Sequence, residues 1–181
     1  MPRPLHVLTI GHSTHAADRF AALLRAHRIG LLGDVRRHPG SRRHPQFDAQ
    51  PLRAALEGTG IAYERFGEQL GGRRRPRRDS PNKGWRGAAF RGYADHMQTP
   101  EFAAGLERLE GLARERRTAI MCAEGDWRRC HRRLIADALA ARGWRVRHIR
   151  PDGRIEDHQL TSFAVVGGGR PSYPAQDSLG V

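Results

Sequence analysis

The chain has 181 residues, of which 38% are hydrophobic, and this excludes a small disulfide scaffold and a wholly disordered polymer. Lys and Arg number 32 against 19 Asp and Glu, which gives a formal net charge of +13, and Lys83 is the single lysine. A field this positive attracts polyanions, and guanidinium groups suit phosphate, so we expect a nucleic acid or nucleotide partner, with DNA favoured over RNA.

Hydrophobic runs in the sequence are short. The apolar stretches at residues 7–10 and 29–32 are far below the length that crosses a bilayer, so no membrane partner is expected. Residues 1–6 contain no apolar targeting region of secretory length, and we therefore expect a cytoplasmic protein. With only two thiols, Cys122 and Cys130, a disulfide framework is not expected there.

The first third of the chain divides into strands and helices by its hydrophobic spacing. A strand is predicted at residues 5–10, followed by a helix at 16–27 with apolar side chains at helical intervals. A continuous apolar run at 29–35 predicts a second, fully buried strand. A short amphipathic helix is predicted at 48–56, where glycines stop it, and a third strand at 61–66.

The remainder begins with a long basic loop at residues 71–88, which has no apolar periodicity. Regular elements resume after this loop and continue to about residue 160. The predicted helices are at 90–97, 100–116 and 130–142, and the predicted strands are at 118–122, 145–149 and, as a last antiparallel strand or extended arm, 154–160.

Alternating strands and helices predict an α/β fold. We expect a single three-layer domain with a mainly parallel sheet, helices on both faces and an antiparallel strand allowed at one edge. This domain covers residues 1–165 and includes the basic loop at 71–88. Residues 166–181 are rich in Gly, Pro and Ser and are expected to form a flexible C-terminal tail.

Reactive side chains follow several of the predicted strands. Because ligands of open parallel sheets collect beyond the carboxyl ends of the strands, we expect a functional site there. The predicted catalytic residues are Asp34, Glu124, His131 and His12. The predicted substrate-binding residues are Ser13, Arg36, Arg42, Arg73, Tyr93, Trp127 and Arg132.

These roles have simpler alternatives that the sequence leaves open. Ser13 precedes a predicted helix, so it either helps to bind a phosphate or, with Thr14, caps that helix. Asp34 ends an apolar strand and acts either as a general base or nucleophile, or only orients Arg36 or Arg42.

A cysteine nucleophile is disfavoured. Cys122 and Arg128 have the Cys-x5-Arg spacing in which a thiolate attacks phosphorus. However, Glu124 and Asp126 lie between them and would repel a phosphate dianion and raise the pKa of the thiol.

A metal site is also disfavoured by the spacing. Cys122, Cys130 and His131, with His12 or His158 as a fourth ligand, include the side chains that bind zinc. Zinc ligands are usually paired two to four residues apart, and we expect the adjacent Cys130 and His131 side chains to point in different directions. We therefore expect no cofactor and no metal, and framework roles for both cysteines.

Taken together, these segments resemble the family known as domain of unknown function 488. The resemblance runs from about residue 7 to residue 164 and implies an α/β fold, but it supplies no settled activity. The motifs that carry it are Thr9-Ile-Gly-His-Ser13, Asp34-Val-Arg-Arg-His-Pro-Gly-Ser-Arg42, Leu70-Gly-Gly72, Phe90-Arg-Gly-Tyr-Ala94, and Met121-Cys-Ala-Glu124 followed by Cys130-His-Arg132.

The functional hypothesis is a nucleic-acid-acting hydrolase, specifically a DNA glycosylase-like enzyme that cleaves the N-glycosidic bond of damaged or modified bases. Asp34 or Glu124 would activate water, His12 or His131 would polarise the departing base, and arginines would hold flanking phosphates. A flipped base would pack against aromatic side chains, for which the candidates are Trp127, Tyr93 and Phe66. The alternatives are a metal-dependent nuclease or phosphodiesterase, and a non-catalytic basic DNA- or RNA-binding module.

Overall fold

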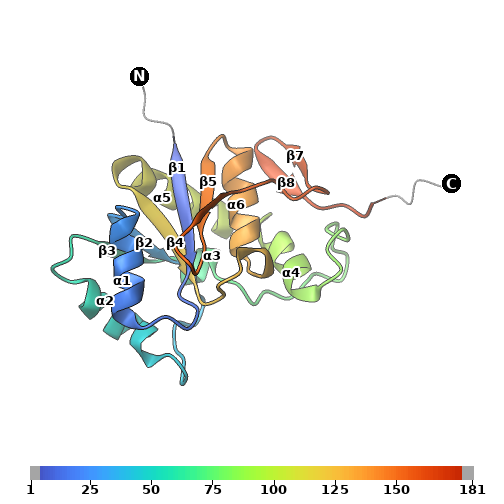
Figure 1. Ribbon diagram of the computed structural model, residues 1–181. Helices are drawn as coiled ribbons and strands as arrows, with labels where there is room; N and C mark the ends of the chain where they lie inside the picture. Colours follow the sequence, from blue (N-terminus) through green and yellow to red (C-terminus); the bar gives the residue numbers. More distant parts are fainter. Residues whose placement is uncertain (1–4, 177–181) are drawn as a thin grey trace.

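A six-stranded sheet forms the centre of the computed structural model, which describes residues 5–176 (Figure 1). The strand order is β3-β2-β4-β1-β5-β6, with β5 and β6 antiparallel and the other neighbours parallel. This confirms the predicted α/β fold with a mainly parallel sheet and an antiparallel edge strand. The strands are β1 (His6–Gly11), β2 (Leu31–Asp34), β3 (Ala62–Arg65), β4 (Thr118–Cys122), β5 (Arg145–Ile149) and β6 (Ile155–Asp157).

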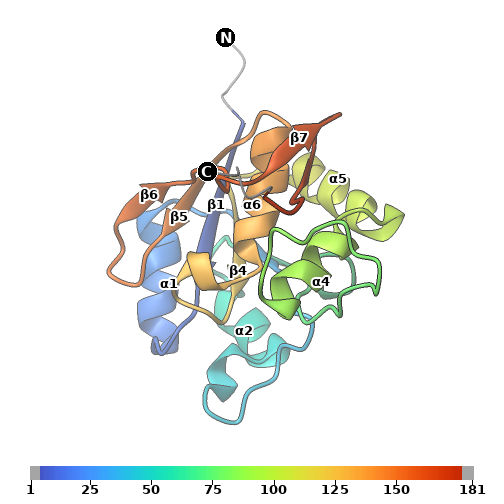
Figure 2. The ribbon, with the colours of Figure 1, turned by 90° about the vertical axis from the view of Figure 1, so that its right-hand side faces the viewer.

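Helices cover both faces of this sheet. Figure 2 shows α1 on one side and α4, α5 and α6 on the other. No helix in residues 5–176 combines the length and apolar character needed to cross a bilayer. The helices are α1 (Ala17–Ala26), α2 (Ala49–Leu56), α3 (Gly67–Leu70), α4 (Ala88–His96), α5 (Pro100–Glu115) and α6 (Arg132–Ala141), with short 3-10 turns η1 (Pro45–Phe47) and η2 (Trp127–Arg129).

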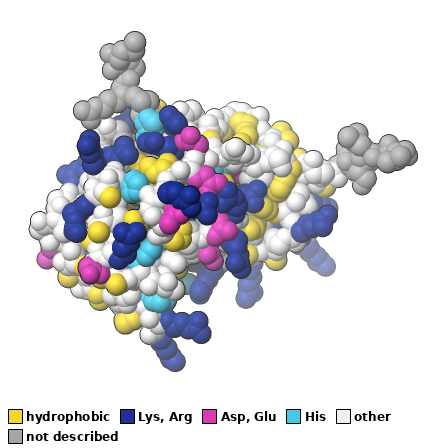
Figure 3. Space-filling view, viewed as in Figure 1, with side chains coloured by type: hydrophobic (Ala, Val, Ile, Leu, Met, Phe, Trp, Pro, Cys, Tyr) yellow, Lys and Arg dark blue, Asp and Glu magenta, His cyan; other side chains and the backbone are white. Residues whose placement is uncertain are grey.

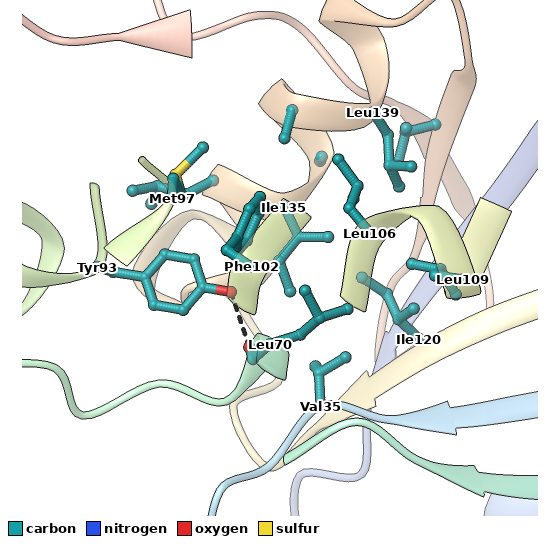
Figure 4. Close-up of a cluster of buried hydrophobic side chains, with 14 of the residues drawn as sticks. Val35, Leu70, Tyr93, Met97, Phe102, Leu106, Leu109, Ile120, Ile135 and Leu139 are labelled. Carbon is teal, nitrogen blue, oxygen red and sulfur yellow. Dashed lines mark hydrogen bonds between the residues drawn. The ribbon is translucent and has the colours of Figure 1, made fainter. Parts of the chain in front are cut away.

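Two hydrophobic clusters fill the spaces between the layers. On β4, Met121 packs into the cluster under α1 and α2, whereas Ile120 and Cys122 belong to the cluster under α3 to α6. This alternation follows from the two-residue period of a strand. Figure 4 shows the larger cluster, in which the Tyr93 hydroxyl donates to the Leu70 carbonyl at 2.7 Å. The strand period therefore places Cys122 on the face that α6 covers.

Sequence signals set the ends of the longest helices. Thr99 caps α5 because its hydroxyl accepts from the Phe102 N–H at 3.2 Å, and Pro100 occupies the first turn, where its missing N–H costs nothing. After α6, Gly143 has φ of 87° and donates to Ala140, while the Trp144 N–H donates to Leu139. This is a Schellman ending, which favours glycine.

The basic loop at 71–88 lacks helix and strand up to Ala88, as predicted, but it is packed against the domain. Asn82 is fully buried, and its side-chain amide donates to Asp95 at 2.8 Å. Its carbonyl oxygen accepts from the Tyr173 N–H at 2.9 Å, and the Gly84 N–H donates to the Tyr173 carbonyl at 2.8 Å. These contacts tie the loop to the C-terminal region.

Residues 166–173, which were predicted to belong to a flexible C-terminal tail (166–181), form regular or buried structure. Strands β7 (Val165–Gly167) and β8 (Arg170–Ser172) form an antiparallel hairpin, and the following Tyr173 is fully buried. Its hydroxyl donates to Asp137 on α6 at 2.7 Å. The Gly- and Pro-rich composition was misleading here, because the burial of a single aromatic ring fixes this segment against α6. Residues 177–181, the rest of the predicted tail, lie outside the described part.

Candidate functional site

A cleft of about 690 Å³ opens at the carboxyl ends of β1, β2 and β4. These strands are parallel neighbours in the sheet, so the segments that follow them lie at the same edge. Helix α4 contributes a further wall through Phe90 and Tyr93. The predicted site residues that line this cleft are His12, Ser13, Arg36, Arg73, Tyr93, Glu124 and His131.

Asp34 lies beneath the cleft and does not line it. Its side chain is fully buried and accepts from Arg36 Nε at 2.9 Å, from Arg36 Nη2 at 2.8 Å and from the Tyr63 hydroxyl at 2.5 Å. Arg36 also donates to the Phe47 carbonyl at 2.6 Å. The predicted catalytic role of Asp34 is therefore corrected: with both oxygens occupied by protein donors, it orients Arg36, which is the alternative left open by the sequence.

Burial also shifts the ionisation of groups around Asp34. Desolvation and the neighbouring Asp34 carboxylate raise the pKa of Tyr63 above its ordinary value, so the phenol stays a hydrogen-bond donor. Although burial opposes its charge, the hydrogen bonds to Asp34 raise the pKa of Arg36. The guanidinium therefore remains a fixed cation in the cleft wall.

The loop after β4 is held against the end of β1 by backbone pairing. The His12 N–H donates to the Cys122 carbonyl and the Ser13 N–H to the Ala123 carbonyl, both at 2.9 Å. These amides are therefore not available to a phosphate. The predicted cap is also wrong, because α1 begins after Ala16 and has no side-chain cap.

This backbone pairing depends on Gly11. A Cβ at Gly11 would collide with the Glu124 carbonyl group, which is backbone and therefore cannot rotate away. We expect Gly11→Ala to lower the free energy of unfolding by about 1–3 kcal/mol, as overpacking does elsewhere. Urea denaturation measures this, with Gly40→Ala as the control, because a Cβ at Gly40 meets nothing within 4 Å. Equal losses in both variants would contradict the close approach at Gly11.

His12 forms part of the cleft wall as a neutral imidazole. Its ring stacks on Phe47 with centroids 4.3 Å apart, and its Nδ1 lies 2.9 Å from the Ser13 carbonyl, so Nδ1 carries the proton. Burial, assisted by Arg36 and His44, lowers the pKa of His12 to about 4. Near neutral pH its Nε2 is therefore an acceptor, which does not fit the predicted role of polarising a departing base.

Cys122, Cys130 and His131 form a compact cluster in the cleft. Their ligand-type atoms all lie within 4.8 Å of one another. His131 Nδ1 is 3.9 Å from Cys122 Sγ and 3.7 Å from Cys130 Sγ. The expectation that the Cys130 and His131 side chains point apart is wrong, because Cys130 is extended (φ −121°, ψ 150°) and His131 is already helical (φ −59°, ψ −15°).

The two thiols differ in their ionisation. The hydrogen bond with Cys130 and burial raise the pKa of Cys122 well above its ordinary value. Burial opposes ionisation of Cys130, yet its pKa lies well below the ordinary value because Cys122, His131 and Arg132 surround its sulfur. Of the two thiols, Cys130 therefore has the lower pKa.

Arg132 is fully buried and supports this cluster from behind, which corrects its predicted role in substrate binding. Its Nε donates to Cys130 Sγ at 3.4 Å and its Nη2 to the Glu124 carbonyl. Its Nη1 donates to Thr9 Oγ1 at 3.2 Å, and Thr9 lies 2.7 Å from His148 Nδ1. Arg132 thus connects the cleft to the buried polar groups between β1, β5 and α6.

Trp127 and Arg128 also lie outside the cleft lining. Trp127 is 7% exposed, and its ring stacks on His148 with centroids 3.9 Å apart, so it does not present a face to a flipped base. Arg128 pairs with Glu156 and lies over the Trp127 ring. The Arg128 guanidinium is therefore not positioned to bind a phosphate beside the Cys122 thiol. This agrees with the sequence argument against a thiol-phosphatase mechanism.

The aromatic surface of the cleft differs from the predicted one. Tyr93 is 1% exposed and packs against the His131 ring, with centroids 5.1 Å apart. Phe66 is also buried, beneath Arg108. Half-buried Phe90 is the more exposed of the two α4 aromatic side chains that line the cleft, and its place in the Phe90-Arg-Gly-Tyr-Ala94 motif was the available signal.

Glu124 is the one carboxylate among the cleft residues in the described part of the chain. Its side chain is exposed, and its Oε1 accepts from the Asp126 N–H at 3.0 Å, which leaves Oε2 without a hydrogen bond in residues 5–176. Basic side chains surround it. Four basic side chains line the cleft that the sequence analysis did not predict: Arg37, His38, His44 and Arg129. The predicted Arg42 is exposed but does not line the cleft.

A family model described as "Domain of unknown function DUF488" matches residues 16–139, more than half of the chain. The chain belongs to this family. The resemblance inferred from the motifs is thereby confirmed. In this DUF488 chain the matched range includes Arg36, Glu124 and the three residues of the Cys122 cluster. No curated protein and no solved structure matches the chain.

Proposed function

We propose that this DUF488 protein is a hydrolase of nucleic acids or nucleotides that cleaves the N-glycosidic bond of a modified or damaged base. The observation that carries the proposal is the exposed Glu124 carboxylate, placed in a cleft whose other charged side chains are basic. In such a reaction Glu124 activates a water whose oxygen bonds to the anomeric carbon. The carbon–nitrogen bond breaks, and the departing base takes up a proton.

Phosphate binding is supported by the charge of the cleft. Arg37, Arg73 and Arg129 line it, and guanidinium groups bind phosphate oxygens through paired hydrogen bonds, whereas Arg36 adds its positive charge from the wall, since its Nε and Nη2 already bond to Asp34. Figure 3 shows further basic side chains spread over the visible face of the molecule, consistent with the formal charge of +13. Long-range attraction of a polyanion and local binding in the cleft therefore act together.

Base binding is supported by Phe90. Its ring is half-buried and rests against Trp85 with centroids 4.8 Å apart, so it is held in place while it remains at the cleft. A flipped base needs an aromatic or apolar face to replace the stacking it loses. Phe90 takes over the role first assigned to Trp127.

The same geometry weighs against the magnesium-dependent nuclease. Magnesium sites in proteins use carboxylate oxygens, commonly more than one, together with water and substrate phosphate. Asp34 is buried and saturated by Arg36 and Tyr63, which leaves Glu124 as the carboxylate at the cleft. A single carboxylate suits the activation of water better than the binding of two metal ions.

Oligonucleotides containing uracil, oxidised or alkylated bases test this proposal. We expect abasic sites and free base as products, with the rate reduced at least about 100-fold in Glu124→Gln, the effect typical of a lost general base. Asp126→Asn is the matched control, because Asp126 is an exposed carboxylate of the same loop that does not line the cleft. Its rate should stay near that of the wild type.

Two outcomes would overturn the proposal. Strand breaks that require magnesium, in place of abasic sites, would establish the nuclease. Salt-dependent binding of DNA or RNA that survives Glu124→Gln, with no product from any substrate, would establish a non-catalytic binding module.

A further inference from the structure

Cys122, Cys130 and His131 bring together two sulfur atoms and one ring nitrogen in the cleft wall. Cys122 ends β4, and Cys130 and His131 stand at the start of α6, so rigid elements position all three. Their arrangement was not expected from the sequence spacing, and the proposed glycosidic cleavage does not use it. Thiolate and imidazole are the ligand types that zinc prefers.

The tautomer of His131 is the second observation. His131 Nε2 lies 2.9 Å from the Val35 carbonyl oxygen, and since that oxygen only accepts, Nε2 carries the proton. In the neutral ring Nδ1 then has a free lone pair on the side of both sulfurs. Metal-binding histidines commonly donate their other N–H to a backbone carbonyl, which holds the ring in this way.

The distances fit a tetrahedral zinc ion. Zn–S bonds of about 2.3 Å and Zn–N bonds of about 2.0–2.1 Å at tetrahedral angles place sulfur and nitrogen about 3.6 Å apart. The observed separations from His131 Nδ1 are 3.9 Å to Cys122 Sγ and 3.7 Å to Cys130 Sγ. The two sulfur atoms lie within 4.8 Å of each other, against about 3.8 Å in a tetrahedral site, so a zinc ion fits after side-chain movements of at most about 1 Å.

We propose that Cys122, Cys130 and His131 bind a zinc ion whose fourth coordination position faces the cleft. Three protein ligands with an open position characterise catalytic zinc sites, whereas structural sites have four protein ligands. The cluster found in residues 5–176 has three members, and all three line the cleft. The fourth position is thus accessible to water or to an atom of a substrate.

Neighbouring groups complete the site. The N–H of Arg132 and its Nε donate to Cys130 Sγ at 3.5 and 3.4 Å, which stabilises the thiolate and fixes its direction. Gly72 lies against the His131 ring: a Cβ there would meet Nδ1, Cγ and Cε1 at 2.9, 3.2 and 3.3 Å. These similar distances place the Cβ over the ring face, so Gly72 leaves the in-plane lone pair of Nδ1 free.

Metal analysis of the full-length protein tests the site without any substrate. Protein purified without a histidine tag and incubated with zinc is expected to retain about one zinc ion per chain after gel filtration, as measured by mass spectrometry of the metal. Cobalt substitution should give thiolate-to-metal charge transfer in the near ultraviolet and the strong visible bands of tetrahedral cobalt. Zinc should also raise the Tm of the wild type.

Variants separate the three ligands from the rest of the cleft. Cys122→Ser and His131→Gln should weaken zinc binding more than about 100-fold, and Gly72→Ala about 10-fold, the range seen when groups that orient a ligand are changed. His38→Ala is the matched control, because His38 is an exposed imidazole of the same cleft outside the cluster, and it should keep the metal.

The proposal is overturned if wild-type protein retains no zinc, if Cys122→Ser retains as much as the wild type, or if the two cysteines are recovered as a disulfide that excludes metal. Cys130 is buried, so a substitution there could unfold the protein and would not inform on zinc. Cys122→Ser is used instead: circular dichroism shows whether this variant is folded, and the cobalt charge-transfer band shows whether it still binds metal. The zinc site and the glycosidic activity are measured separately, so either can fail alone.

Discussion

Asp34→Ala is expected to lower the free energy of unfolding by about 3–5 kcal/mol, the cost of breaking a buried ion pair by removing one partner. The Arg36 guanidinium would lose both of its bonds to the Asp34 carboxylate, and its backbone N–H would lose a third. The Arg36 side chain is only 7% exposed in the ion pair, so its charge would be left largely buried. Tyr63 would lose its acceptor as well. Urea denaturation followed by circular dichroism measures the change.

Two further variants show whether the unpaired charge causes this loss. Adding Arg36→Met to Asp34→Ala should recover part of the stability, because a buried pair replaced as a whole leaves no uncompensated ion. Asp79→Ala removes the partner of Arg77 in an exposed pair and should have little effect, because water screens such pairs. A double variant no more stable than Asp34→Ala would contradict the assigned cause.

The regular elements were predictable where one local signal was sufficient. Strand β4 has the predicted bounds 118–122, because a short apolar run buried on both faces has no competing pattern. Helix α5 begins at the predicted Pro100, where a threonine cap precedes a proline. The family model matches the part of the chain that carries most of the motifs, so these signals also sufficed for the family.

The location of the site could be predicted from the sequence, but the roles of several of its residues could not. The rule for parallel strand ends selects Glu124 and His131 correctly as cleft residues. It does not distinguish a side chain at the surface from one turned inward, so Asp34 and Arg132 were misplaced. Their burial depends on partners distant in sequence, such as Tyr63 for Asp34, and no periodicity encodes such contacts.

The cysteine cluster shows the same limit. Sequence spacing treats Cys130 and His131 as neighbours that diverge, but the change from extended to helical backbone between them brings both side chains to Cys122. The Val35 carbonyl that orients His131 comes from the end of β2, 96 positions away. The bond can form because β2 and β4 are parallel neighbours, which brings the residues that follow them to the same edge of the sheet.

Acidification should destabilise the protein through two buried imidazoles. Burial, with the neighbouring His158, Arg132 and Arg128, lowers the pKa of His148 to about 2, and the pKa of His12 is lowered to about 4, against 6.5 for an ordinary histidine. Between these values and pH 6.5 the unfolded chain binds protons that the folded chain does not. The stability contributed by the neutral rings is therefore complete above pH 6.5 and is lost as the pH falls.

Each imidazole contributes a slope that reaches about 1.4 kcal/mol per pH unit below pH 6.5, where the unfolded ring is half protonated. Integrated between pH 6.5 and pH 5, the two together should lower the free energy of unfolding by about 3 kcal/mol. His148→Gln isolates one of them, because an amide can still accept from Thr9 and donate to His158 while it does not titrate. Urea denaturation at a series of pH values should show a loss between pH 6.5 and pH 5 that is about 1.5 kcal/mol smaller in this variant than in the wild type. An unchanged dependence would mean that His148 is protonated in the folded protein, which its stacking on Trp127 and its hydrogen bond to His158 oppose.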